Sequence, residues 1–310
     1  MNEKLYIIGN GFDIYHGLST RYESFAFYLQ DNAREIYDLL IQYYSLPHLD
    51  KKNPDSVYGL CLWSEFEKTL ADLDFEQVLD DNTDYLPNIS SDDFRDRDWH
   101  SYQIEMEMIV DKLTKDLFSQ FKEFINSREY PELEESKRLN LDESALFFNF
   151  NYTNTLGHYY QIDESNILYI HNKANSQYTL VLGHSINPES FRIDEQKQQE
   201  MADDYDFSYE SGKEEIMTYF SKSFKPTEKI INENLLFFNK CSAVKKIYIL
   251  GHSLSEIDEP YIVKILDSVT KDVSLIVTYY SEAEKESHKS KLMELGVEEE
   301  RITVIKMNEL

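Results

Sequence analysis

The chain contains very little cysteine, with only Cys61 and Cys241 among its 310 residues. Two cysteines cannot build the disulfide framework that holds small secreted domains together, and they lack the close pairing of a zinc knuckle. The scarcity therefore argues against a disulfide-rich or zinc-ribbon protein. We expect both thiols to be reduced and buried, because each stands among apolar or neutral neighbours.

Positive charge is also scarce, since 31 Lys and Arg residues face 58 Asp and Glu residues and the formal net charge is −27. Proteins that hold nucleic acid through its phosphates depend on clustered Lys and Arg. The composition therefore disfavours nucleic acid as a partner. It still allows a small anion site built from backbone N–H groups, which needs no net positive charge.

Long apolar runs are missing as well. No window approaches eighteen uncharged apolar residues, so we expect no membrane span and no membrane partner. The first residues lead into a strand-like segment without the charged and apolar regions of a signal peptide. We therefore expect a cytoplasmic protein.

Several catalytic motifs are absent from the sequence. It contains no GxxxxGK[ST] loop and no GxSxG elbow, which disfavours a P-loop NTPase and a serine hydrolase. No two histidines stand at the spacing of a metal-binding pair, so we expect no metal site.

Aromatic and aliphatic residues are plentiful, and 41% of the chain is hydrophobic. Strand-like segments alternate with helical ones, most clearly in the last third of the chain. This alternation predicts an α/β fold with a doubly wound, mostly parallel, Rossmann-like sheet. The expected strands span residues 4–8, 144–150, 167–170, 178–182, 245–250, 273–279 and 301–306.

Apolar residues at helical spacing interrupt this pattern after the first strand. They predict a helix of about six turns that ends near Tyr44, a helix over 60–80 and a second long helix over 100–126. We interpret residues 46–130 as a helical insertion within a single Rossmann-like domain that spans residues 1–310. A further helical stretch is expected over 211–240, and helices over 259–270 and 282–294.

Five of the predicted strands are followed by segments rich in glycine, amide and histidine residues. These segments span residues 9–13, 149–154, 171–172, 183–185 and 251–255. In one parallel sheet all five would line the same edge, where such folds bind ligands. Glycine N–H groups suit a pyrophosphate, and amides, carboxylates and imidazoles suit ribose and proton transfer. The pattern therefore predicts a nucleotide-binding pocket.

Each segment also has a plain structural interpretation. A Gly-x-Gly pair after a strand often serves only a turn, and Asp13 can cap local N–H groups. Asn151 and Asn154 are common turn residues. The histidines that follow the strands, including His171, can be satisfied core residues. The convergence of all five segments at one edge favours the ligand site.

The strand-end sequences resemble those of a known family. IIGNGFDIYHGLSTRYESF, LWSEFE, FNFNYTNTL, YIHN and YILGHSLSEIDEPYI are similar, in this order, to motifs of the bacteriophage abortive infection AbiH family. The resemblance extends to about residue 265. Ser19 and Asn172 replace an expected proline and an expected glycine. Asparagine adopts positive φ more readily than most residues, so the turn at Asn172 can persist. The resemblance implies a role in phage defence.

A more distant likeness connects the same segments to sirtuins and sirtuin-like defence NADases. It implies cleavage of the bond between nicotinamide and ribose in NAD. Asn151 would hold the attacking water or the ribose, and His171 would act as general base or orient a ribose hydroxyl. Thr153 stands where those proteins carry an acid. The chain has no zinc-binding cysteine quartet, which disfavours protein deacylation.

The same likeness implies a set of nucleotide-binding residues. Gly9, Asn10 and Gly11 would cradle the pyrophosphate, while Ser253 and Asp258 would contact the adenosine side. Asp13 would order the loop or approach the nicotinamide ribose. The remaining members of the set are Gly17, Asn154, Gly251 and His252.

Three functional hypotheses follow. The first is an NAD-consuming enzyme, with NAD as substrate and no required cofactor. The second is a sensor or switch that binds a nucleotide without chemistry. The third, disfavoured by the charge, is an effector that acts on nucleic acid. None of the three hypotheses identifies the phage-derived trigger, and each is compatible with a homo-oligomer.

Overall fold

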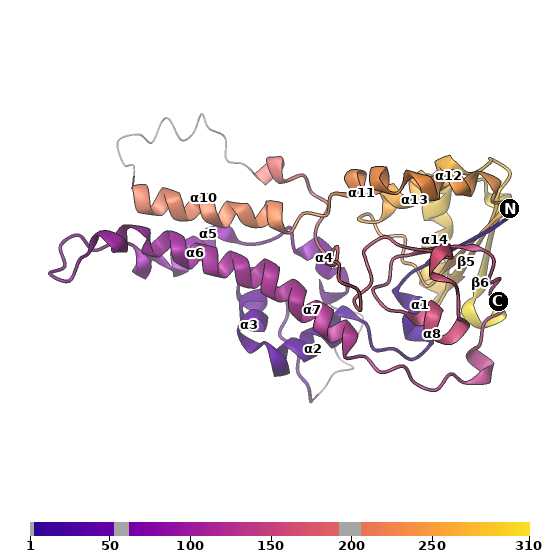
Figure 1. Cartoon of the computed structure of the whole chain (residues 1–310), viewed down its shortest axis with the longest axis horizontal. Helices are drawn as coiled ribbons and strands as arrows, with labels where there is room; N and C mark the ends of the chain where they lie inside the picture. Colours follow the sequence, from indigo (N-terminus) through magenta and orange to yellow (C-terminus); the bar gives the residue numbers. More distant parts are fainter. Residues whose placement is uncertain (1–2, 53–61, 192–205) are drawn as a thin grey trace. The chain divides into compact units, whose positions relative to one another are not determined.

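The computed structural model describes residues 3–52, 62–191 and 206–310, and the chain divides into two compact units (Figure 1). The sheet unit comprises residues 1–21, 122–181 and 226–310. The helical unit comprises residues 22–121 and 182–225. Most of the predicted insertion over 46–130 therefore belongs to the helical unit, which also takes in two further segments of the chain.

The sheet unit is built on six strands that all run parallel. Their order across the sheet is β3-β2-β1-β4-β5-β6. This is the doubly wound order of a Rossmann-like fold, and it confirms the predicted fold class. The order reverses between β1 and β4, which are neighbours in the sheet. The strands are β1 (Lys4–Ile8), β2 (Leu146–Asn149), β3 (Ile167–Tyr169), β4 (Lys246–Leu250), β5 (Ser274–Tyr279) and β6 (Ile302–Lys306).

Both faces of the sheet are covered, because side chains alternate between them along each strand. In β1, Leu5 and Ile7 join one apolar cluster, whereas Tyr6 and Ile8 join the other. The first cluster includes residues of α11 (Thr227–Glu233), α12 (Leu235–Lys240), α13 (Glu259–Ser268) and α14 (Glu282–Glu294). The second includes residues of α1 (Asn10–Tyr15) and α8 (Thr155–Tyr160). The continuous apolar runs of the central strands follow from this double burial.

One predicted strand is wrong. Residues 178–182 belong to none of the strands in the described chain. Tyr178 and Thr179 are exposed, and the segment follows the end of β3 through two isolated hydrogen bonds. Val181 N–H donates to the His171 carbonyl, and the Asn172 side chain donates to the Thr179 carbonyl. Two isolated bonds do not form a ladder, so the segment stays irregular.

The helical unit contains a pair of long helices that lie side by side, α6 (Ser101–Asp111) and α10 (Phe207–Lys222), as Figure 1 shows. Gly212 permits their close approach, since a Cβ there would lie 2.3 Å from the Tyr102 ring. A π-helical turn, Lys112–Asp116, joins α6 to α7 (Leu117–Asn126), so the long helix predicted over 100–126 is confirmed. The other α-helices of this unit are α2 (Tyr22–Asn32), α3 (Arg34–Tyr43), α4 (Phe66–Thr69) and α5 (Phe75–Asp81).

Several predicted helices are shorter than expected. The predicted six-turn helix breaks at Ala33, where φ is −147° and ψ is 58°, into α2 and α3. The helix predicted over 60–80 is divided into a 3₁₀ turn, α4 and α5; its first residues fall within 53–61, outside the described chain, as does Cys61. The stretch 211–240 is also divided, because Pro226 cannot continue a helix beyond α10.

Cys241, the other cysteine, is buried as expected, and burial raises the pKa of its thiol to about 12. Among the described residues we find no helix with the length and apolar character that a bilayer span requires.

Candidate functional site at the carboxyl edge of the sheet

The loop after β1 packs directly on the loop after β4. Gly9 N–H donates to the Leu250 carbonyl at 3.0 Å, and Gly11 N–H donates to the Gly251 carbonyl at 2.7 Å. A Cβ on Gly9 would lie 2.5 Å from the His252 Cα, so only glycine allows this approach. In this structure the N–H groups of Gly9 and Gly11 are therefore used in hydrogen bonds that join the two loops.

Gly251 completes the contact from the other side. Its φ is +61°, and a Cβ would lie 2.2 Å from the Phe12 backbone nitrogen. Its N–H donates to the Thr278 hydroxyl at 2.9 Å, which links the loop to β5. The two strands at the switch point thus end in loops that pack backbone against backbone.

Two side chains of these loops remain near solvent. Asn10 is exposed, and its side-chain carbonyl accepts a hydrogen bond from the Thr20 hydroxyl at 2.6 Å. Ser253, on the β4 loop, is also exposed. Both residues stand beside the glycines that fix the loops.

Asn151 connects the loop after β2 to the loop after β1. Its side-chain amide donates to the Gly9 carbonyl at 3.0 Å, and its backbone N–H donates to the Asn149 side chain at 3.0 Å. Asn151 is buried. The residue predicted to hold water or ribose therefore has a defined orientation beside the glycine loop.

Asp13 lies in the same buried region, with only 1% of its surface exposed. Its two carboxylate oxygens accept hydrogen bonds from the hydroxyls of Thr153, at 2.7 Å, and Thr155, at 2.6 Å. Burial raises the pKa of Asp13 to about 6, although the hydrogen bonds from Thr155, Thr153 and Asn151 oppose the shift. The carboxyl group joins α1 to the start of α8.

Asn154 and Gly17 shape the surrounding turns. Asn154 N–H donates to the Tyr130 hydroxyl at 2.8 Å, and its side-chain oxygen accepts from the Tyr169 hydroxyl at 3.1 Å. Gly17 has a φ of +85° and ends α1. Asn172 has a φ of +65°, which confirms the left-handed turn expected at this asparagine.

A second polar group forms around Asp258, which immediately precedes α13. His171 Nε2 lies 3.9 Å from Asp258 Oδ1, and His252 Nε2 lies 3.6 Å from Asp258 Oδ2. The Phe150 ring packs on both imidazoles, with centroid distances of 5.5 Å to His171 and 4.2 Å to His252. Histidines from the ends of β3 and β4 thus face one carboxylate, and Phe150 from the end of β2 packs on both of them.

The expectation that five strand ends line one edge is wrong for the segment 183–185, because residues 178–182 before it form none of the strands of the described sheet. His184 belongs to the helical unit, where its ring nitrogen Nε2 lies 3.1 Å from the Phe220 carbonyl oxygen. Its backbone N–H donates to the Ser223 carbonyl at 3.0 Å, and burial lowers the pKa of its imidazole. The sequence LGHS occurs at residues 182–185 and again at 250–253, and only the second copy follows a strand of the sheet.

Sequence reasoning missed a buried ion pair in the helical unit. A carboxylate oxygen of Glu67 lies 2.9 Å from the ammonium of Lys225, whose side chain is fully buried. The Tyr22 hydroxyl donates to the other carboxylate oxygen of Glu67 at 2.5 Å. The LWSEFE segment offered a signal, because Glu65 and Glu67 flank Phe66 and Trp63 stands close by, and both aromatic residues are buried.

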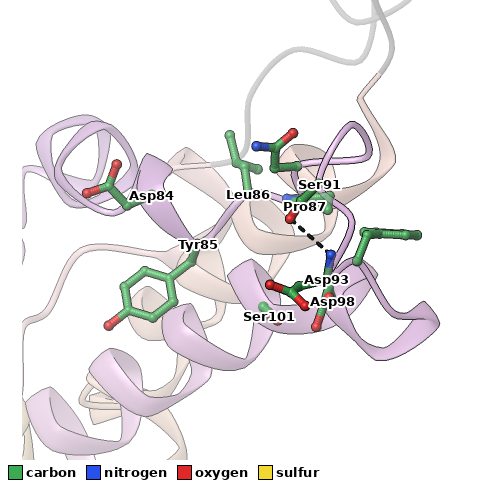
Figure 2. Close-up of a pocket in the computed structure, with 10 residues that line it drawn as sticks. Asp84, Tyr85, Leu86, Pro87, Ser91, Asp93, Asp98 and Ser101 are labelled. Carbon is green, nitrogen blue, oxygen red and sulfur yellow. Dashed lines mark hydrogen bonds between the residues drawn. The ribbon is translucent and has the colours of Figure 1, made fainter.

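A surface hollow also occurs in the helical unit (Figure 2). Three of its lining residues are acidic, Asp84, Asp93 and Asp98, and none is among the predicted site residues. Asp93 N–H donates to the Ser91 hydroxyl at 3.3 Å within it. Across the described ranges, no group of three His, Cys, Asp or Glu residues is arranged to hold a metal ion.

Fold and site together define a Rossmann-like α/β protein with a polar cluster at its topological switch point. The chain belongs to the AbiH family, because the family model described as Bacteriophage abortive infection AbiH matches residues 5–279. This membership supports a role in phage defence by abortive infection. A search of curated proteins gives no match to the chain.

Proposed function

We propose that the carboxyl edge of the sheet binds NAD and hydrolyses its nicotinamide–ribose bond, so that the infected cell loses the dinucleotide. The observation that carries the proposal is the meeting of polar groups from the ends of β1, β2, β3 and β4 beside the switch point. Gly9 contacts Asn151, and His171 faces Asp258 across the edge. Ligands of doubly wound sheets bind outside the strand ends at this point.

The hydrolysis needs only a positioned water and a base. The water oxygen bonds to the ribose C1′, the C1′–N bond breaks, and its electron pair leaves with neutral nicotinamide. The proton of the water passes to His171, and ADP-ribose is the second product. Asn151, which is buried and oriented by two hydrogen bonds, holds the water or a ribose hydroxyl.

The pyrophosphate is assigned to the exposed part of the two glycine loops. Gly9, Gly11 and Gly251 hold these loops against each other, and Asn10 and Ser253 present polar groups to solvent beside them. Asp13 has a structural role in the loop, because its two carboxylate oxygens accept hydrogen bonds from threonine hydroxyls. This division gives the glycines a structural role and their neighbours the phosphate contacts.

A nucleotide-binding sensor is the second candidate, and two observations favour it. Thr153 stands where sirtuin-like enzymes carry an acid, and here its hydroxyl bonds to Asp13. The N–H groups of Gly9 and Gly11 already donate to protein carbonyls. A site of this kind binds a nucleotide and transmits its presence without turnover.

Proton NMR of NAD mixed with the full-length protein tests the proposal. Wild-type protein should release free nicotinamide, and His171→Ala should lower the rate by about 100-fold or more, since it removes the base. His100→Ala is the matched control, because His100 is exposed and lies in the helical unit. Its rate should equal that of the wild type.

The other outcomes separate the candidates. Broadened NAD signals without nicotinamide would support the sensor and overturn hydrolysis. Equal turnover by wild type and His171→Ala would remove His171 from the mechanism. Unchanged NAD signals at high protein concentration would overturn NAD as the ligand.

A further inference from the structure

Asp258 occupies the N-cap position of α13 but makes no side-chain cap hydrogen bond to that helix. An aspartate at this position usually accepts a hydrogen bond from the second or third N–H of its helix. Here its two oxygens instead face two imidazoles, at 3.9 Å from His171 Nε2 and 3.6 Å from His252 Nε2. The Asp258 carboxylate therefore faces the histidines at two strand ends and does not cap its own helix.

His252 has a defined tautomer in this arrangement. Leu254 N–H donates to His252 Nδ1 at 2.9 Å, so Nδ1 acts as the acceptor and the proton of the neutral ring resides on Nε2. That nitrogen faces Asp258 Oδ2, to which the Ser255 hydroxyl also donates at 3.4 Å. Oδ2 is thus held by residues of its own loop, and Oδ1 faces His171.

The loop maintains this geometry through an uncommon backbone conformation. Leu254 has a φ of +56°, a conformation that a non-glycine residue rarely adopts and that is energetically unfavourable. The Leu254 side chain is buried, which offsets that cost. The conformation places the Leu254 N–H against the His252 ring.

His171 approaches the carboxylate from the end of β3. Its ring packs near Phe150, Tyr152 and Tyr261, with centroids 5.5, 5.8 and 5.9 Å away. The titratable groups in contact with it include Asp258 and the two tyrosines, with His252 at the other oxygen of the same carboxylate, and Asp258 is the acid among these groups. His171 is 2% exposed, so the Asp258 charge acts with little screening by water.

We infer that Asp258 is the positioning residue of His171, and that His252 and Ser255 hold Asp258 in place for this task. His171 keeps a proton on Nε2 toward Asp258 and receives the proton of the attacking water on Nδ1. The carboxylate stabilises the imidazolium that forms, as a carboxylate does behind a general-base histidine. The role in turnover rests on the proposed function, and it replaces the adenosine contact expected of Asp258.

NMR titration of the histidine rings in the full-length protein tests the assignment without any substrate. Asp258→Asn should move the His171 midpoint to lower pH by about one unit, because it removes the charge that favours the imidazolium. The Asp258 side chain makes no cap hydrogen bond to α13, so the helix should persist in this variant. Asp267→Asn, an exposed change on the same helix, should leave the midpoint unchanged. An unchanged midpoint in Asp258→Asn would overturn the inference.

NAD turnover supplies the second measurement. Asp258→Asn should lower kcat by at least about tenfold with KM unchanged, since positioning acts on the chemical step. A raised KM with wild-type kcat would overturn the inference in favour of an adenosine contact. If wild type shows no turnover, the proposed function fails on its own, and the titration still decides whether Asp258 controls His171.

Discussion

Asp13 places a carboxyl group between two threonine hydroxyls where almost no water reaches it. The hydrogen bonds favour the ionised form, and the loss of water favours the neutral form. Burial is the larger effect and raises the pKa of Asp13 to about 6. A single side chain thus connects α1 to α8 and makes stability depend on pH.

The sign of this dependence follows from the two pKa values. The folded pKa of about 6 exceeds the ordinary value of 3.8, so the folded protein binds more protons between these pH values. The stabilisation is complete below the lower value and is lost as pH rises through the higher one. Between about pH 5 and pH 7, we expect the free energy of unfolding to fall by about 1 kcal/mol through this group.

Asp13→Asn should lack that fall, because the amide does not titrate. Urea unfolding at several pH values measures the difference between wild type and variant, which should change by the same amount. Asp267→Asn, an exposed change, provides the control. A difference between wild type and Asp13→Asn that is constant with pH would contradict the expected titration.

At the scale of elements, the loops after β1 and β4 form the contact on which the site is built. Glycine is required there by close approach, since Gly251 combines a left-handed φ with a backbone neighbour at 2.2 Å from its missing Cβ. Gly296 has a similar φ of +87° but nothing within 4 Å. Comparing substitutions at Gly251 and Gly296 therefore distinguishes the cost of backbone strain from the cost of a steric clash.

Gly251→Ala should therefore destabilise the protein by more than Gly296→Ala. Gly296→Ala carries the left-handed cost alone, about 1 kcal/mol. Gly251→Ala adds a clash that forces the two loops apart, and we expect a total of about 3 kcal/mol or more. Chemical denaturation of both variants measures the difference. Equal losses would mean that the loops separate without cost.

The helices illustrate how far pattern reasoning reaches at this scale. Helical periodicity found the helix from α6 through α7, although two of its apolar residues, Ile104 and Met108, are exposed. It did not find the break at Ala33, because the same face continues in α3 and a shift in two dihedral angles leaves no trace in the pattern. The Asn32 side chain donates to the Tyr28 carbonyl and satisfies a group at the end of α2.

For the whole molecule, the formal charge of −27 is the dominant electrostatic feature. Excess charge of one sign destabilises a compact chain through self-repulsion. Salt weakens this repulsion, because the Debye length falls from about 30 Å at 0.01 M to about 10 Å at 0.1 M. We expect the Tm at pH 7 to rise by about 2–4 °C over this interval.

Differential scanning fluorimetry in NaCl and in KCl measures this rise and separates ionic strength from effects of one cation. The rise should be the same in both salts. A falling Tm would mean that favourable ion pairs, such as Arg34 with Asp38, outweigh the repulsion.

The site was partly predictable because β-strands in one parallel sheet end at one edge. The positions of the glycine loop, Asn151, His171 and Gly251 at this edge were therefore predictable from sequence, and their roles in binding or catalysis stay predictions. His184 was misplaced, since a strand-like segment followed by LGHS gives no sign that it belongs to another compact unit. The pairing of Glu67 with Lys225 was missed for a different reason, because the two residues are 158 positions apart in the sequence.

The sequence by itself determined the fold class, the edge at which polar groups gather and the AbiH family, because periodicity and local motifs are properties of neighbouring residues. Only the tertiary structure decided what those groups do to one another. It alone places Asp258 between His171 and His252 and directs the N–H groups of Gly9 and Gly11 at Leu250 and Gly251. Such contacts join segments far apart along the chain, and their geometry depends on the packing of the whole sheet unit.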